Sequence, residues 1–184
     1  MRGRVKLAAG VAALAAVSVA GTVAVAGGGD SVREELTGYE ETPLALSTTG
    51  NGSFRARIDE RQQEISYRLR YADLEGTVAQ AHIHFGARAQ SGGISVFLCT
   101  NLGNGPAGTQ ACPAAPASVS GTITPADVIG PAAQGISAGQ FGELVDAIRA
   151  GATYANVHTS LYPAGEIRAQ IEGDNDDDDD ESDD

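Results

Sequence analysis

The three histidines of this chain are spaced so that they could act together. His82 and His84 are one residue apart in a run that alternates polar and apolar residues, and His158 lies in a second such run. Successive side chains of a strand point to opposite faces, so His82 and His84 would share a face, roughly 7 Å apart. If His158 lies on a neighbouring strand, three imidazoles converge. Imidazole suits copper and zinc, so one hypothesis is a metal site formed by these three histidines, with copper ahead of zinc.

The same histidines could instead form a structural hydrogen-bonded network on a polar strand face. Polar residues near the third histidine offer partners for either arrangement: Asn156, Glu166, Arg168 and Gln170. In a metal site, Asn156, Glu166 and Arg168 would surround the ligands, because a metal-bound histidine usually donates its second nitrogen to a partner. Both interpretations remain open from the residues alone.

One further motif concerns catalysis. Residues 135–139 match the Gly-x-Ser-x-Gly pattern of serine hydrolases. That pattern has meaning only at a turn from a strand to a helix above a parallel sheet, and no apolar strand precedes it here. Ser137 is also the expected start of a capping box with Gln140. The sequence therefore predicts no catalytic residue and does not predict an enzyme.

The first 26 residues have the features of a signal peptide. Arg2, Arg4 and Lys6 precede a continuous run of apolar or small residues, and Ala24-Val25-Ala26 is a small-x-small cleavage site. A retained membrane anchor is the alternative, but the run is mostly Ala, Val and Gly, which favour a bilayer weakly. We expect a secreted or extracellular protein, or one of the periplasm or cell envelope, without stable membrane insertion after cleavage.

The charge of the chain is concentrated at its end. The net charge is −12 at pH 7, and nine of the 24 acidic residues lie between positions 174 and 184. Residues 173–184 are therefore expected to be a disordered acidic tail. It serves either as a solubilising extension or as a weak, multivalent cation binder. No nucleic-acid partner is expected in so acidic a chain.

Cys99 and Cys112 are the only cysteines. In an exported chain, an even pair most simply forms a disulfide, which would contribute roughly 3 kcal/mol through loop closure. A redox pair or two thiolate metal ligands are the alternatives.

Most of the chain alternates with a period of two. A hairpin is expected from its apolar positions, and its other face carries Arg55, Arg57, Arg68 and Arg70, either as a solvated surface or as an anion-binding stripe. Strands are predicted at residues 53–59, 64–71, 79–85, 94–99, 118–124, 153–158 and 166–172. Such short strands indicate an antiparallel sandwich or barrel.

One helix is expected before the last hairpin. Ser137 and Gln140 form the capping box, apolar residues follow at helical spacing, and Gly151 supplies the left-handed stop. A further helical turn is expected at residues 124–127.

Several of these segments together resemble the CHRD (chordin) domain family in its single-domain exported form. The matching segments are Leu36–Pro43, Ala81–Gly86, the helix 138–150, Tyr154–Thr159 and Pro163–Gln170. The resemblance implies a domain over residues 35–172, preceded by a short linker at 27–34. It also implies an immunoglobulin-like or superoxide-dismutase-like β-sandwich or barrel.

The resemblance further implies a role outside the cell. In chordin, the domain belongs to an extracellular antagonist of growth factors, so we expect a non-enzymatic binding or structural module with a protein or cell-surface partner. His82-Ile83-His84 is similar to the copper-binding His-x-His strand of copper/zinc superoxide dismutase. Three histidines cannot hold both metals of that enzyme, so a copper-binding protein with a single ion and a redox or superoxide-related role is the alternative.

Overall fold

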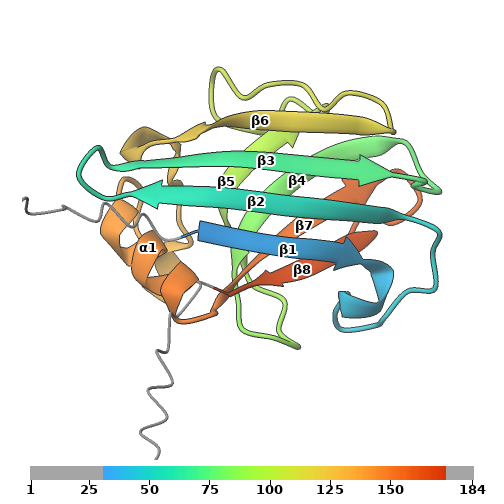
Figure 1. Cartoon of the computed structure of the whole chain (residues 1–184), viewed down its shortest axis with the longest axis horizontal. Coiled ribbons are helices and arrows are strands. Elements are labelled where there is room, and N and C mark those ends of the chain that lie inside the picture. Colours follow the sequence, from blue (N-terminus) through green and yellow to red (C-terminus); the bar gives the residue numbers. More distant parts are fainter. Residues whose placement is uncertain (1–30, 173–184) are drawn as a thin grey trace, which may run out of the picture.

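Eight antiparallel strands form a single sheet that curls into a nearly closed barrel (Figure 1). The structure, a computed structural model, describes residues 31–172. The expected signal peptide and acidic tail lie outside the described residues. The strands are β1 (Ser31–Thr37), β2 (Asn51–Asp59), β3 (Glu64–Ala72), β4 (Val78–Phe85), β5 (Gly93–Thr100), β6 (Ala117–Ile123), β7 (Thr153–Thr159) and β8 (Ile167–Ile171).

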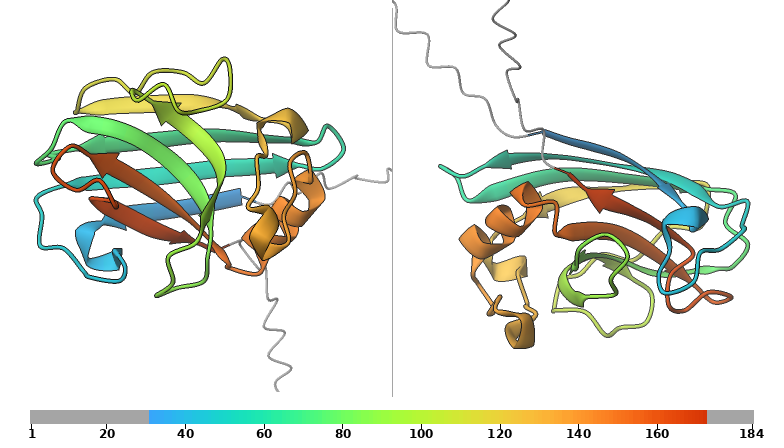
Figure 2. Two further views of the ribbon diagram at one scale, coloured as in Figure 1. Left: turned by 180° about the vertical axis from the view of Figure 1, so that it is seen from behind. Right: turned by 90° about the horizontal axis from the view of Figure 1, so that it is seen from below.

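The strands lie in the order β5-β4-β7-β8-β1-β2-β3-β6 around the barrel. Figure 2 shows the resulting two layers, with β6, β3, β2 and β1 on one side and β5, β4, β7 and β8 on the other. The mainly β, antiparallel fold expected from the alternation is confirmed. β1 begins at Ser31, four residues before the domain boundary suggested by the sequence.

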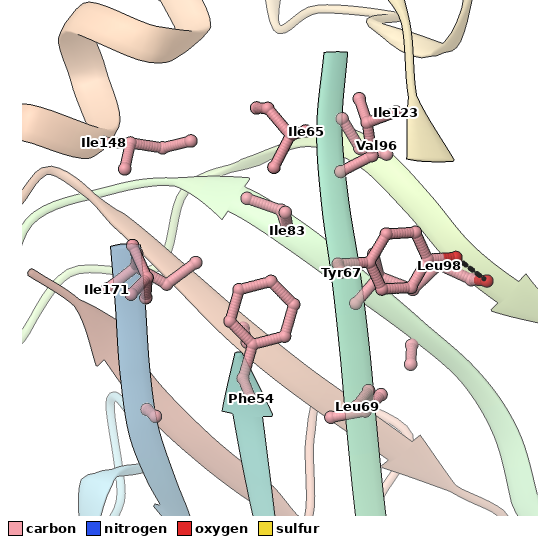
Figure 3. Close-up of a cluster of buried hydrophobic side chains, with 14 of the residues drawn as sticks. Phe54, Ile65, Tyr67, Leu69, Ile83, Val96, Leu98, Ile123, Ile148 and Ile171 are labelled. Carbon is pink, nitrogen blue, oxygen red and sulfur yellow. Dashed lines mark hydrogen bonds between the residues drawn. The ribbon is translucent and has the colours of Figure 1, made fainter. Parts of the chain in front are cut away.

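The period-two pattern explains which residues fill the barrel. In the β2–β3 hairpin, Phe54 pairs with Leu69 and Ile58 pairs with Ile65, and all four side chains are buried. Figure 3 shows apolar side chains from both layers meeting there. Burying each side chain of this size contributes about 1.5–3 kcal/mol, so the buried face fixes the register.

The α-helix α1 (Phe141–Arg149) lies at one end of the barrel, before the last two strands (Figure 1). The capping box does not start it. Gln140 Oε1 accepts the Ser137 backbone N–H as expected, but Gly139 adopts the left-handed conformation with φ +84° and separates that turn from the helix. The left-handed stop at Gly151 and a 3-10 turn at Pro125–Asp127 are confirmed.

The two edge strands, β5 and β6, are bridged by a side chain instead of a backbone ladder. Gln110 Nε2 donates to the carbonyl oxygens of Leu98 on β5, at 3.2 Å, and of Ser120 on β6, at 3.3 Å. The loop carrying Gln110 is tied to β5 by the Cys99–Cys112 disulfide. This bond confirms the structural pairing of the cysteines. No helix among residues 31–172 has the length and apolar character needed to cross a membrane.

Candidate metal centre

The pairing of β4 with β7 brings the three histidines together. His82 lies opposite Asn156, and Gln80 lies opposite His158. Ala81 and Ile83 point into the apolar core, so His82 and His84 project from the outer face of the sheet, as does His158. The condition for a three-histidine site, that the two histidine-bearing strands are neighbours, is therefore met.

The three rings form one buried cluster. His82 Nδ1 lies 3.1 Å from His158 Nε2. The ring centroids of His82 and His84 are 5.2 Å apart, and those of His84 and His158 are 5.6 Å apart. One candidate ligand nitrogen from each ring lies within 4.8 Å of the other two. His82 is completely inaccessible to solvent, and His84 and His158 are 7% and 6% exposed.

Two backbone carbonyls fix the orientation and tautomer of two of the rings. His84 Nδ1 lies 3.0 Å from the carbonyl oxygen of Gly92, and His158 Nδ1 lies 3.1 Å from that of Pro163. A carbonyl oxygen can only accept, so each Nδ1 carries the proton and each Nε2 carries a lone pair. His158 Nε2 then accepts the proton of His82 Nδ1.

This arrangement leaves two buried nitrogens without a partner. His82 Nε2 and His84 Nε2 have no hydrogen-bond partner within the described part of the chain. Both must be lone-pair acceptors by the proton assignment above. Buried polar atoms are nearly always satisfied, so two orphans in one cluster call for an explanation. A metal ion bound to these lone pairs would supply one.

Burial keeps the imidazoles neutral, which is the form that binds metals. Desolvation, together with smaller effects of the neighbouring His158 and His84, lowers the pKa of His82 to about 2. Desolvation likewise lowers the pKa of His84 and of His158 to about 4, against the raising effect of their carbonyl partners. At neutral pH no proton competes for the Nε2 positions.

A column of stacked groups supports His84 from the side. The rings of His84 and Tyr154 are 4.8 Å apart and parallel within 2°. The guanidinium carbon of Arg168 lies 3.5 Å from the centre of the Tyr154 ring. Because β7 lies between β4 and β8, the tyrosine is sandwiched between the histidine and the arginine. Arg168 therefore reaches the site through Tyr154 and not through a direct hydrogen bond.

Arg168 also anchors the loops that cover this face. Its guanidinium donates to the carbonyl oxygens of Gln90, at 2.9 Å, and Ala87, at 3.3 Å, and to the Thr42 hydroxyl. These partners come from the segments before β2 and between β4 and β5. A lysine could not make this fork of bonds.

Asn156 has a different partner from the one expected. Its Nδ2 donates to Glu41 Oε1 at 2.6 Å and to the Ile167 carbonyl oxygen at 3.1 Å. Glu41 is buried, and desolvation raises its pKa to about 7, although Asn156 and Arg168 both act to lower it. The pair ties the segment after β1 to β7, beside the histidines.

Glu166 likewise bonds to loops and not to a histidine. Its carboxylate accepts from the hydroxyls of Thr48, at 2.8 Å, and Thr159, at 2.7 Å, and from the Glu75 backbone N–H, at 2.7 Å. It is fully buried. It therefore fastens the loops at the end of the sheet and does not orient the ligands directly.

The sequence did not single out Tyr154, Glu41, Gly92 or Pro163 as part of the site. Tyr154, Glu41 and Pro163 lie inside the segments that carried the family resemblance, which was the available signal. The role of the Gly92 and Pro163 carbonyls had no sequence signal, because the direction of a loop carbonyl depends on the folded loop.

The three rings fit one transition-metal ion after two adjustments. The first is that His158 Nε2 releases the hydrogen bond that it accepts from His82 Nδ1, so that its lone pair can bind the ion. At metal–nitrogen distances of about 2.0–2.1 Å, two ligands of one ion are at most roughly 4.2 Å apart. The candidate nitrogens span up to 4.8 Å, so the second adjustment is that at least one ring moves inward by a fraction of an ångström. The neutral nitrogen donors suit copper or zinc. The three-histidine group could therefore bind a metal.

Comparison with known protein families matches residues 32–171 to the CHRD domain. No curated protein and no solved structure matches the chain. The family match covers almost all of the described barrel, including the histidine strands and the loops around them. CHRD domains occur in extracellular proteins, and the disulfide is consistent with that setting. The chain belongs to the CHRD domain family.

Proposed function

We propose that this protein is an exported, non-enzymatic CHRD module that binds one copper ion through His82, His84 and His158. The observation that carries the proposal is the pair of buried, unpartnered Nε2 atoms on His82 and His84. A purely structural histidine network would be expected to satisfy these nitrogens. The export part of the proposal is supported by the family and by the disulfide.

Copper is preferred to zinc because of the ligands and their surroundings. For nitrogen donors, divalent copper binds more tightly than divalent zinc. The site has three neutral ligands. The stack of His84 on Tyr154 ends in the positively charged guanidinium of Arg168. Burying an ion costs free energy that rises with the square of its charge, so a monovalent ion is favoured here. Copper can bind as the monovalent ion Cu(I), whereas zinc binds only as the divalent ion.

A metal titration of the mature protein tests the proposal. Protein prepared without a chelator is loaded with Cu(I) under ascorbate and assayed against a colorimetric copper chelator. We expect one equivalent of copper per chain. His84→Phe keeps a ring stacked on Tyr154 but removes the nitrogen ligand, so it should lower the affinity at least about 100-fold and leave the thermal unfolding cooperative.

The matched control is Gln80→Leu, on the same strand but outside the ligand set, where Gln80 bonds to Asn104. It should bind copper like the unchanged protein. Failure of the unchanged protein to take up Cu(I), Cu(II) or Zn(II) would leave only the structural network. Equal uptake by His84→Phe would place the metal elsewhere.

A further inference from the structure

Five arginines gather on the outer face of β1, β2 and β3. Arg33, Arg55 and Arg68 lie directly opposite one another across the three strands, and Arg57 and Arg70 flank them on the same face. We call these five residues the arginine array. All five are exposed. Neighbouring strands are about 4.8 Å apart, so the central row spans roughly 10 Å.

The arginine array forms no ion pairs with other described residues. Within residues 31–172, none of its members forms a salt bridge, although Arg88 and Arg149 elsewhere do. Glu35, Asp59 and Glu64 are on the same face but make no ion pair with them. Like charges directly opposite each other destabilise a sheet. In a chain with a net charge of −12, this concentration of positive charge is a local exception that an anionic partner would stabilise.

The chain itself carries such an anion at its acidic end. β8 ends at Ile171, and the Glu172 backbone N–H donates to Glu34 Oε1 at 3.1 Å. Glu34 is next to Arg33 in β1 but points to the opposite face of that strand. Nine of the last eleven residues are acidic, from Asp174 to Asp184. Twelve residues can span roughly 40 Å, which is several times the width of the central row.

We infer that residues 174–184 dock on the arginine array within the same molecule. The described chain ends at Glu172, beside β1, and the acidic residues that follow are enough to reach the other face of β1 and cross the array. Covalent linkage gives it a high effective concentration there, whereas an external polyanion would have to approach an acidic protein. The docked segment would neutralise the like-charge row and shield this face from other anions. The contact is electrostatic, so salt should weaken it, since the screening length falls from about 10 Å at 0.1 M to about 3 Å at 1 M.

A spin label in the acidic segment tests this contact in the full mature chain. Ser182→Cys places a nitroxide without removing any acidic residue, and the native cysteines are paired. We expect the backbone amide signals of Arg33, Arg55 and Arg68 to lose most of their NMR intensity at low salt. The intensity should return at 1 M NaCl.

Two charge reversals provide the matched comparison. Arg55→Glu removes the centre of the array, and Arg61→Glu makes the same charge change at an exposed position in the β2–β3 turn. The first should abolish the broadening and the second should retain it. Broadening that is uniform over the barrel, insensitive to salt or equal in both variants would overturn the inference. So would broadening that appears only between separately labelled molecules, because the occupant would then be a second copy.

Discussion

Two carbonyl oxygens determine how the histidines can act. The Gly92 and Pro163 carbonyls fix the Nδ1 protons of His84 and His158, so each of these rings has its lone pair on Nε2. The lone pair of His84 is unpartnered, and that of His158 accepts from His82 Nδ1 until a metal replaces this bond. The alternation of polar and apolar residues was enough to predict that His82 and His84 would share one face of a sheet, and that His158 would join them if its strand were a neighbour. It could not predict their tautomers, because these depend on loop carbonyls whose directions are set only by the folded chain.

The buried histidines should make the metal-free protein sensitive to mild acid. Their folded pKa values of about 2 and about 4 lie below the ordinary value of 6.5, so between these limits the unfolded chain binds protons that the folded chain does not. The free energy of unfolding should therefore fall as the pH falls from 6.5 towards 4. Glu41, with a folded pKa of about 7, acts in the opposite direction between pH 4.5 and 7.

The three histidines lower the free energy of unfolding as the pH falls, and the one glutamate raises it. The net decrease in the free energy of unfolding should therefore be at most roughly 3 kcal/mol per pH unit. Urea unfolding between pH 4.5 and 6.5, with a chelator present, measures this slope. His82→Leu should show a shallower slope, because one proton-binding difference is removed. A stability that does not change over this window would contradict the assigned neutral state of the histidines.

At the scale of elements, regular alternation was a dependable guide and local helix signals were less so. The hairpin of β2 and β3 and the strand β4 follow from apolar residues at every second position. The pairing of β4 with β7 does not, because alternation says nothing about which strands become neighbours. The helix start was displaced because Gly139 adopts φ +84° between the capping pair and the first helical residue. β1 was not predicted as a strand, since Glu34 and Glu35 interrupt its alternation.

The loop between β4 and β5 should control metal affinity through one glycine. A Cβ atom at Gly92 would lie 1.7 Å from the Phe85 carbonyl oxygen, so Gly92→Ala must displace the carbonyl that orients His84. We expect copper affinity to fall roughly 10- to 100-fold, as for other losses of a ligand's supporting partner. Competition with a copper chelator measures the change.

Gly135→Ala is the control for this substitution. Gly135 has φ +103°, and a Cβ there would contact nothing within 4 Å among the described residues. It should cost about 1–2 kcal/mol of stability through its left-handed backbone and leave copper affinity unchanged. An equal loss of affinity in both variants would mean that the Gly92 carbonyl has no specific role.

The whole molecule is a barrel that closes weakly between its edge strands β5 and β6, which we call the seam. The strand order leaves β5 and β6 without a backbone ladder, and Gln110 bridges them from a loop held by the disulfide. The cysteine pairing was predictable from their number in an exported chain. The bridging by Gln110 was not, because it depends on how far the curled sheet closes.

Removing the disulfide should weaken the seam and spare the metal site. Cys99→Ala/Cys112→Ala releases a cross-link between residues 13 positions apart. It should lower the free energy of unfolding by roughly 3 kcal/mol, as measured by urea unfolding. Copper binding to the folded variant should be unchanged, since the ligand group consists of the three histidines. A loss of copper at full folding would show that the seam and the site are coupled.

The most direct test of the histidine site is X-ray absorption by the copper-loaded full chain. The account predicts a copper shell of three nitrogen atoms at about 2.0 Å, with the outer-shell scattering that imidazole rings produce. A shell dominated by oxygen and lacking imidazole scattering, as carboxylates of residues 174–184 would give, would contradict it.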